Sequence, residues 1–383
     1  MKVLFLTNMP SYHQMELARR LAELLGDANF RIVFYKPTSN SRTEMGWDDS
    51  YSDSFVLRFW QSEHTRTEIR HWISNADVVI HGRFPIAHVR KRINSGKLTF
   101  AYQERYFKRK FSYLKVMFRS HRIIKNYWSV NRPNYHLLAA GAYTASDLNR
   151  IGMFHGRSWK FGYFIEPSDT INKNISGSEL TLLWCARFSP VKQPQQVLEI
   201  ARGLQQRKVR FKLTMVGDGE LRAQTERAVT VYGLSDQIKI LGWQTPEQVK
   251  ALMRSADIFL MTSHQGEGWG IVVNEAMSNG CATVVNRAVG SAPWLIQHGK
   301  TGLIYEDEHL EKLLDEITNL SQQQLNTIGR AGYQHMVDTW SCQAAAKRFV
   351  SLAGHLLDQQ NKDASNGHSI DTPFASGPCS PAT

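Results

Sequence analysis

The chain has 383 residues, of which 42% are hydrophobic and 21% are charged, so it is long enough for two globular domains with buried cores. Its net charge of +12 is concentrated between Arg83 and Arg132, where 14 lysines and arginines accompany a single acidic residue, Glu104. The four cysteines form no CxxC pair, which argues against a disulfide framework or a zinc site and indicates a reducing compartment.

Strands and helices alternate weakly in the first half of the chain. We expect "KVLFLT" to be the first strand. Its apolar run is too short for the alternative, a signal peptide. A helix is predicted in "QMELARRLAELLG", ending at Gly26, and further strands in "RIVFY", "ADVVIHG", "KLTFAY" and "YHLLAAG". The polar and aromatic stretch 37–74 has no clear pattern. No run approaches the 18 apolar residues of a membrane-spanning helix.

The second half has a sharper pattern from Leu180 onward. Strand-like runs recur in "LTLLWCARF", "FKLTMVG", "IKILGW", "DIFLMTS" and "ATVVN", with helical stretches between them. One helix carries a full start signal: Thr245 as N-cap, Pro246 at the first helical position and Gln248 three residues after the cap. Strands that alternate with helices predict parallel βαβ units and a doubly wound α/β sheet.

The domain organisation follows from this pattern and from the composition between its parts. We predict an N-terminal α/β domain over 1–166, a polar linker over 167–179 and a C-terminal α/β domain over 180–340. A C-terminal helix over 341–359 is expected to return to the N-terminal domain. Residues 360–383 have the composition of a disordered tail.

Candidate ligand-binding residues follow three strands of the second half. In an open α/β sheet, ligands bind at the carboxyl ends of the strands. "CARFSPVKQP" offers Arg187 and Lys192 there, and "VGDGE" follows the next strand. "SHQGEGWGIVVNEAMSNG" places Glu267 and Glu275 eight residues apart, around a helix that starts near Ile271. Basic side chains and a helix N-terminus suit a diphosphate, and a carboxylate suits sugar hydroxyls.

These segments resemble glycosyltransferase family four. The resemblance rests on the two glutamates within "EGWGIVVNEAMSNGCATVV", and on "CARFSPVKQP", "VGDGEL", "ILGW" and "HGKTGLIY", which follow one another in order over residues 180–305. It implies two Rossmann-like doubly wound domains facing a cleft, the B-type glycosyltransferase fold. The first domain would bind the acceptor and the second the donor. The implied reaction is retaining transfer of a sugar from a nucleotide diphosphate sugar.

The resemblance also implies roles for individual residues. Arg187 and Lys192 would hold the donor diphosphate, Glu275 the ribose hydroxyls, and Glu267 the transferred sugar. Glu267 is expected to position the sugar and to stabilise charge, not to form a covalent bond. Further donor contacts are expected from Gly217, Trp243, Gly268, Trp269, Gly270 and Ile271, and acceptor-side groups from His81 and Glu104.

Several assignments keep an alternative. "VGDGE" is either a nucleoside contact or only a tight turn, Trp243 either lies beside the base or belongs to the core, and His81 is either structural or acceptor-binding. Two departures from the family stand out: "TNMPSYHQ" lacks a glycine-rich first loop, and Gln193 follows Lys192 where glycine is usual.

The basic segment supports competing interpretations. Over 83–132 it fits a nucleic-acid-binding protein, although no nucleic-acid module accompanies it. A sugar-nucleotide epimerase of the same fold is a second alternative, but its family lacks this glutamate spacing. A basic amphipathic helix over about 104–126 would lie on anionic lipid or pack on the domain with a wet face. Its two stripes are Phe107, Phe111, Leu114, Phe118 and Lys108, Lys115, Arg119, Arg122.

We therefore predict a retaining glycosyltransferase of the bacterial surface-polysaccharide type, peripheral on the cytoplasmic face of the cell membrane. The expected partners are a nucleotide-sugar donor, with UDP favoured over GDP, a lipid-linked saccharide acceptor and an anionic membrane surface, but no nucleic acid. No cofactor is expected. No metal is expected either, because the sequence contains no Asp-x-Asp.

Overall fold

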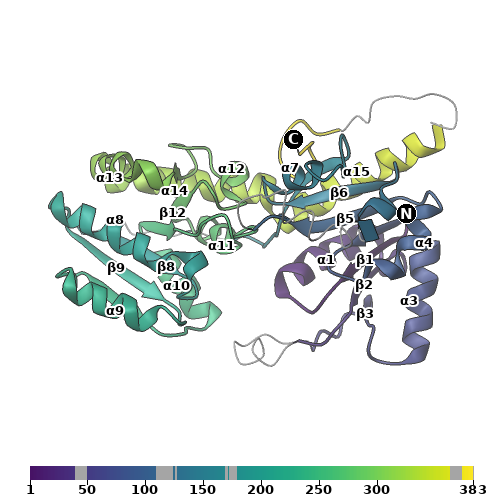
Figure 1. The fold of residues 1–383 in the computed structure, drawn as a ribbon, viewed down its shortest axis with the longest axis horizontal. Coiled ribbons are helices and arrows are strands. Elements are labelled where there is room, and N and C mark those ends of the chain that lie inside the picture. Colours follow the sequence, from purple (N-terminus) through teal and green to yellow (C-terminus); the bar gives the residue numbers. More distant parts are fainter. Residues whose placement is uncertain are drawn as a thin grey trace. The chain divides into compact units, whose positions relative to one another are not determined.

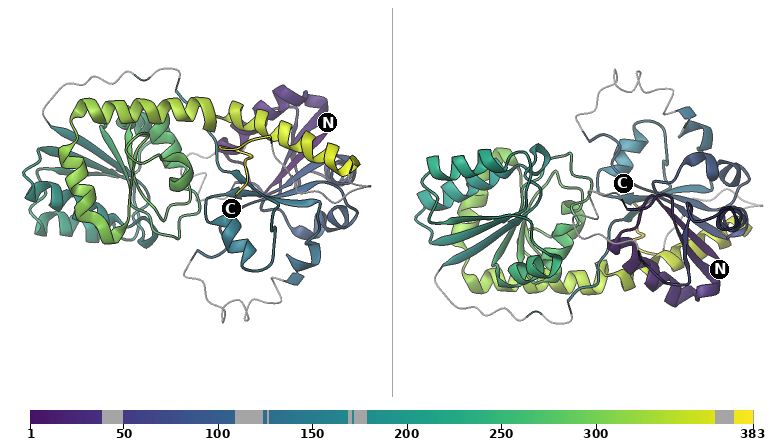
Figure 2. Two further views of the ribbon diagram at one scale, coloured as in Figure 1. Left: turned by 90° about the horizontal axis from the view of Figure 1, so that it is seen from above. Right: turned by 90° about the horizontal axis from the view of Figure 1, so that it is seen from below.

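The computed structural model describes residues 1–38, 50–108, 124–125, 127–168, 171, 179–362 and 373–382. The chain divides into two compact units, and many of their helices and strands are labelled in Figure 1. Unit 1 comprises Met1–Ile165 and Thr339–Thr383, and unit 2 comprises Glu166–Asp338. Each unit is a parallel sheet with helices on both faces (Figure 2). Among the described residues, no helix has both the length and the apolar content that crossing a membrane requires.

Unit 1 contains a seven-stranded sheet in the order β3-β2-β1-β4-β5-β6-β7, with every neighbouring pair parallel. Central strands of a doubly wound sheet are covered on both faces and so become continuous apolar runs; all five residues of β1 are buried. The strands are β1 Val3–Thr7, β2 Phe30–Phe34, β3 Val56–Arg58, β4 Val78–His81, β5 Thr99–Glu104, β6 Tyr135–Ala140 and β7 Ser158–Phe161.

The helices of unit 1 include one from the far end of the sequence. The long helix α15, Cys342–Lys362, packs against α1, Tyr12–Leu25. Alanines and larger apolar residues of α15 are buried, among them Ala345, Phe349 and Leu352. The described part of this unit also contains the helices α3 Glu63–Asn75, α4 Arg90–Asn94 and α7 Thr144–Asn149.

Unit 2 contains a six-stranded parallel sheet in the order β10-β9-β8-β11-β12-β13. Its strands are β8 Leu180–Cys185, β9 Phe211–Val216, β10 Ile238–Leu241, β11 Ile258–Met261, β12 Ala282–Asn286 and β13 Leu303–Tyr305. Its helices are α8 Pro194–Gln206, α9 Arg222–Val231, α10 Pro246–Ser255, α11 Val272–Ser278, α12 Ala292–Leu295, α13 Leu310–Asn319 and α14 Gln322–His335. The strand order reverses between β8 and β11, and such a switch point is where open α/β sheets bind ligands.

Local signals explain where some helices begin. The predicted start of α10 is confirmed: the Thr245 hydroxyl accepts a hydrogen bond from the Gln248 amide, and the Gln248 side chain accepts one from the Thr245 amide. Ser321 and Gln324 form the same reciprocal arrangement at the start of α14. Each arrangement satisfies two backbone amides that the helix itself leaves unpaired.

The prediction of a disordered tail over 360–383 is wrong for residues 373–382. α15 continues to Lys362, and the end of the chain then pairs antiparallel with the edge strand β7. Lys160 and Ser158 of β7 exchange backbone hydrogen bonds with Cys379, Ser380 and Ala382 at 2.7–2.8 Å. The tail thus covers an otherwise open sheet edge, where unpaired backbone groups invite association.

Candidate active site

Two loops of unit 2 are joined at the switch point of its sheet. One follows β8 and contains a short helical turn, Pro190–Lys192, and the other follows β11. The amide of His264 donates to the carbonyl of Val191 at 3.0 Å. The hydroxyl of Thr262 donates to the carbonyl of Lys192 at 2.8 Å. These hydrogen bonds hold the end of the first loop against the start of the second.

Lys192 and Glu267 meet across these two loops. The Lys192 ammonium donates a hydrogen bond to a Glu267 carboxylate oxygen. Their side chains are 24% and 16% exposed, so solvent screens this ion pair less than a pair on the open surface. The structure therefore brings together two residues that the sequence assigned to one ligand.

Glu275 acts on the same corner of the sheet. It lies in the first turn of α11 and is partly buried. The Glu275 carboxylate also affects Cys185, the last residue of β8. Burial raises the pKa of the Cys185 thiol to about 12; the charge of Glu275 adds to this increase, and the charge of Lys192 opposes it. The surroundings therefore disfavour the thiolate and do not activate Cys185 as a nucleophile. Arg187 follows two residues later and is exposed.

The loop after β9 packs closely against the loop after β8. Gly217 has a φ of +129°, and a Cβ at this position would lie 2.1 Å from the Ala186 carbonyl oxygen. The Phe188 amide also donates to the Asp218 carbonyl at 2.9 Å. A glycine is therefore required here by the fold itself, whether or not the turn touches a nucleoside. Trp243 is 51% exposed, so it does not belong to the core.

The predicted Gly268–Ile271 segment presents only part of itself to a ligand. The Trp269 side chain is buried, donates from its indole nitrogen to the Asn274 side chain at 2.9 Å, and packs near Trp294. Gly270 has a φ of +85°, a conformation that glycine adopts readily. Because the Trp269 ring is committed to the core, a donor contact from this residue would have to come from its backbone.

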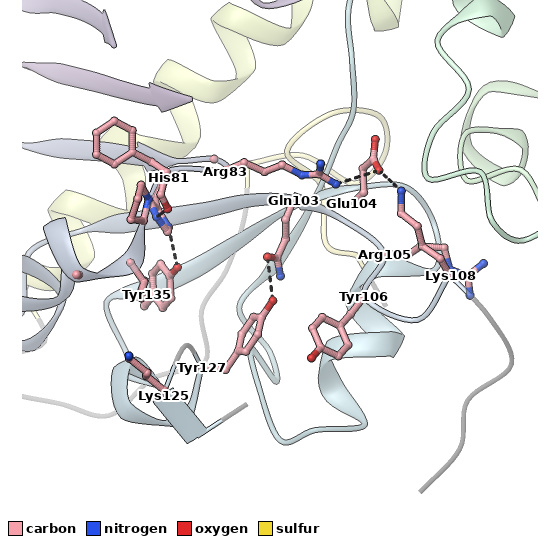
Figure 3. A pocket seen from close by; sticks show the side chains of 15 residues that line it. His81, Arg83, Gln103, Glu104, Arg105, Tyr106, Lys108, Lys125, Tyr127 and Tyr135 are labelled. Atoms are coloured by element: carbon pink, nitrogen blue, oxygen red, sulfur yellow. Dashed lines mark hydrogen bonds and ion pairs between the residues drawn. The ribbon is translucent and has the colours of Figure 1, made fainter. Parts of the chain in front are cut away.

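A second group of predicted residues lines a pocket of unit 1. The pocket has a volume of about 640 Å³ and lies at the carboxyl ends of β4 and β5 (Figure 3). Both predicted acceptor-side residues, His81 and Glu104, line it. So do Gln103, the neighbour of Glu104, and Arg83 and Lys125, which belong to the basic segment 83–132 but were not predicted as acceptor-side groups. Arg83 is the second residue after β4 and Gln103 is the last but one of β5, so the carboxyl-end rule could have identified these two.

His81 has a structural role in this pocket. Its Nε2 donates to the Phe84 carbonyl at 2.7 Å, and its Nδ1 accepts from the Tyr135 hydroxyl at 3.2 Å. Burial lowers the pKa of His81 to about 4, partly opposed by the Phe84 hydrogen bond. The neutral tautomer with the proton on Nε2 fits both bonds. Both ring nitrogens form hydrogen bonds within the protein, so neither is available to bind an acceptor substrate.

Glu104 is the acidic centre of the pocket lining. One of its oxygens accepts from Lys108 at 2.9 Å and lies 3.9 Å from Arg83. The other accepts from the Tyr163 hydroxyl at 3.1 Å. Its side chain is 20% exposed. Unlike His81, Glu104 retains an exposed face towards solvent.

Several charges of the basic segment serve the fold. Arg92 is buried and donates to the carbonyls of residues 73, 76, 77 and 98 and to the Thr99 hydroxyl. Burial lowers the pKa of Arg92 to about 10, so the side chain remains charged. Lys97 donates to the Ser74 carbonyl, and Arg105 pairs with the buried Asp147. These contacts weaken the argument for a nucleic-acid surface.

The predicted amphipathic helix over 104–126 differs from expectation at its beginning. Glu104 is the last residue of β5, and Phe107 is buried beside Tyr106, which removes Phe107 from any lipid contact. Lys108 pairs with Glu104. The remaining stripe residues lie outside the described part of the chain: Phe111, Leu114, Lys115, Phe118, Arg119 and Arg122.

Comparison with known sequences gives a match over the second unit. Residues 167–335 match the model of the family described as Glycosyl transferases group 1. The amylovoran biosynthesis glycosyltransferase AmsK of Erwinia amylovora is 30% identical over 154 residues, 39% of this chain and 38% of that protein. The chain spans less than half the length of the curated relatives it matches. Neither a nucleic-acid-binding protein nor an epimerase is favoured by these matches.

Comparison with solved structures covers nearly the whole chain. Anabaena Alr3699/HepE in complex with UDP has a TM-score of 0.64 and 15% identity, over 95% of this chain and 99% of that one. The lipopolysaccharide outer core galactosyltransferase WaaB has a TM-score of 0.65 and 16% identity, over 92% and 98%. These likenesses concern the fold, and the prediction of two Rossmann-like units of the B-type glycosyltransferase fold is confirmed.

Proposed function

We propose that the protein is a retaining glycosyltransferase that moves a sugar from a nucleotide diphosphate sugar to a saccharide acceptor. The observation that carries this proposal is the ion pair between Lys192 and Glu267, in the loops after β8 and β11, with Glu275 near enough to Cys185 at the end of β8 to add to the increase that burial causes in the pKa of its thiol. These residues lie within the part that matches Glycosyl transferases group 1. The name of the Erwinia relative supports a role in the synthesis of a surface polysaccharide.

The diphosphate of the donor is assigned to Arg187 and Lys192. Lys192 is held by one carboxylate, that of Glu267. A diphosphate carries more negative charge than this single carboxylate and would draw the ammonium towards itself. Glu275 would accept hydrogen bonds from the ribose hydroxyls, for which an ionised carboxylate is well suited. We expect UDP to be favoured over GDP.

The transfer breaks the bond between the anomeric carbon and the diphosphate oxygen. A new bond forms from an acceptor hydroxyl on the same face of the sugar, and the hydroxyl proton leaves towards the departing diphosphate. Negative charge grows on the diphosphate as the bond breaks, and Arg187 and Lys192 stabilise it. Glu267 orients the sugar hydroxyls and stabilises positive charge at the anomeric carbon.

The acceptor is proposed to be a lipid-linked saccharide at the cytoplasmic face of the membrane. Support comes from the name of the Erwinia relative, an amylovoran biosynthesis glycosyltransferase. The attachment predicted through residues 104–126 stays a prediction, with Phe107 removed from it. Metal independence likewise stays a prediction: activity should survive EDTA, and rescue of lost activity by magnesium or manganese would contradict it.

A two-stage experiment tests the proposed function. Uridine and guanosine diphosphate sugars are first screened for thermal stabilisation of the full chain, since a ligand that binds only the folded protein stabilises it by mass action. Release of nucleotide is then measured for the best donor in Arg187→Ala, Lys192→Ala and the control Lys239→Ala, an exposed residue of β10. We expect turnover to fall about 100-fold or more in the first two variants and to persist in the control. Absence of stabilisation by every donor, or wild-type turnover in both variants, would overturn the proposal.

A further inference from the structure

The pocket of unit 1 has more positive than negative charge on its walls. Arg83, Arg105, Lys108 and Lys125 line it, with Glu104 as the acidic member of the described lining. Arg105 is balanced by the buried carboxylate of Asp147, 3.4 Å away. The three remaining cations, Arg83, Lys108 and Lys125, are therefore accompanied by one carboxylate, that of Glu104.

Glu104 leaves much of this charge uncompensated. It binds Lys108 at 2.9 Å, whereas Arg83 lies 3.9 Å away and is 68% exposed. Among the described residues, no salt bridge is found for Lys125, which is exposed at the pocket. The labelled side chains in Figure 3 show Arg83, Lys108 and Lys125 coming from separate segments around the pocket. Like charges gathered around one cavity attract an anion into it.

The pocket also has a neutral donor that lacks an acceptor. The Tyr127 hydroxyl donates to the side-chain oxygen of Gln103 at 3.5 Å, which directs the amide (Figure 3). The Gln103 Nε2 is buried and has no hydrogen-bond partner among the described residues. A buried amide donor without a partner is unfavourable, so this group favours a ligand that has acceptor oxygens.

A further part of the lining, residues 84–87, is apolar: Phe84, Pro85, Ile86 and Ala87. The volume of about 640 Å³ lies within the usual range for small-molecule sites. The cavity is thus large enough for a sugar ring that carries a charged group, with the apolar lining against the ring. Cations and an amide donor would meet the oxygens of the charged group.

We infer that this pocket binds an anionic group, a phosphate ester or a carboxylate attached to a sugar. Its identification as part of the acceptor rests on the proposed function. Phosphates and carboxylates share the chemistry that the pocket offers, which is several acceptor oxygens with negative charge. The acceptor would therefore be a sugar phosphate, including one at a lipid headgroup, or an acidic sugar.

The test measures dissociation constants by ligand-observed NMR for glucose 1-phosphate, glucuronic acid and glucose. The full chain carries Arg187→Ala and Lys192→Ala, so that the proposed donor site does not compete for phosphate. We expect at least one of the two anions, glucose 1-phosphate or glucuronate, to bind at least about tenfold more tightly than glucose does. Preference for the phosphate ester or for the carboxylate then identifies the source of the anionic group.

Variants within this background locate the binding. Arg83→Gln with Lys125→Gln should weaken anion binding about tenfold, and so should Gln103→Glu, which replaces the amide donor with a repelling carboxylate. The matched control, Lys2→Gln with Lys91→Gln, removes two exposed charges of unit 1 outside the pocket and should change binding less than about twofold. Equal affinity for glucose and both anions, or unchanged anion affinity in the pocket variants, would overturn the inference.

The donor screen keeps the two proposals apart. If no nucleotide sugar stabilises the chain but the anions bind through Arg83, Lys125 and Gln103, the proposed function falls and the anion site stands. If donors bind and turn over but the pocket variants leave anion binding unchanged, the anion site falls and the proposed function stands.

Discussion

At the scale of single residues, the ion pair between Lys192 and Glu267 leads us to expect different effects of the two side chains on nucleotide binding. Lys192→Ala removes a cation from the proposed diphosphate site and should weaken UDP binding about tenfold. Glu267→Gln removes the carboxylate that holds Lys192 and should leave UDP binding equal or tighter, while turnover falls. Calorimetric titration measures UDP binding in both variants, and nucleotide release measures the turnover of Glu267→Gln. Equal weakening of UDP binding by both substitutions would contradict the assigned roles.

Glu275 is predicted to act on donor binding directly. Glu275→Gln replaces a charged acceptor with a neutral one, and the lost charge-assisted hydrogen bonds should weaken UDP binding by about 1.5–3 kcal/mol. The control is Glu247→Gln, an exposed carboxylate in the first turn of α10. Calorimetry with UDP compares the two. Wild-type affinity in a folded Glu275→Gln variant would remove this residue from the ribose role.

The backbone conformation of Gln193 accounts for one departure from the family pattern, the glutamine that follows Lys192 where glycine is usual. It has a φ of +47° and a ψ of +60°, a left-handed conformation that glycine adopts freely and β-branched residues adopt poorly. The glycine usual in the family therefore reflects the backbone, and glutamine occupies the same conformation at some cost. We expect the Gln193→Gly variant to be more stable than Gln193→Val by about 1–2 kcal/mol in urea unfolding. Equal stabilities would show that the turn does not depend on this conformation.

At the scale of elements, the sequence predicted best where periodicity and end signals coincide. The strands from β8 to β12 and the start of α10 are confirmed because apolar runs and a capping box fix them locally. The unassigned stretch 37–74 holds β3 and most of α3. β3 has three residues, and only Thr65, Ile69 and Ile73 of α3 are buried, so the apolar period is too sparse to detect.

Longer-range arrangements escaped the sequence for a different reason. Composition predicted disorder for the tail because its partner, β7, lies about 220 residues away in the chain. The pocket of unit 1 collects side chains after β4, at the end of β5 and before β6. Their proximity depends on strand order, which no local pattern contains. Lys192 and Glu267 could be predicted to lie together because the resemblance to glycosyltransferase family four assigns both residues to one donor site.

The tail on β7 should stabilise unit 1. Arg348 of α15 donates to the carbonyls of Ser376 and Pro378, and its guanidinium lies 4.6 Å from the centre of the Phe374 ring. Ending the chain after Lys362 should lower the free energy of unfolding by about 2–4 kcal/mol and promote self-association through the exposed edge. Arg348→Ala should reproduce part of the loss, and Lys347→Ala, exposed on the same helix, should not. Unchanged melting temperature and size-exclusion profile after truncation would contradict a stabilising role.

At the scale of the whole molecule, buried histidines are concentrated in unit 1. Burial lowers the pKa of His81 to about 4 and the pKa of His13 and His136 to about 3. The unfolded chain takes up protons on these imidazoles below about pH 6.5, whereas the folded chain does not until the pH approaches 4. Protons therefore favour the unfolded state, and the free energy of unfolding should fall as the pH decreases from about 6.5 to 4.

Each buried histidine should contribute a slope of about 1.4 kcal/mol per pH unit across that interval. His81→Gln keeps a donor and an acceptor for the Phe84 carbonyl and the Tyr135 hydroxyl but removes the titrating group. Urea unfolding at pH 7, 6 and 5 should show a shallower decline for this variant, even if its stability at pH 7 is lower. His64→Gln, at an exposed position of α3, should keep the slope of the parent. A His81→Gln variant that loses stability with acid as steeply as the parent would show that His81 takes up no proton on unfolding.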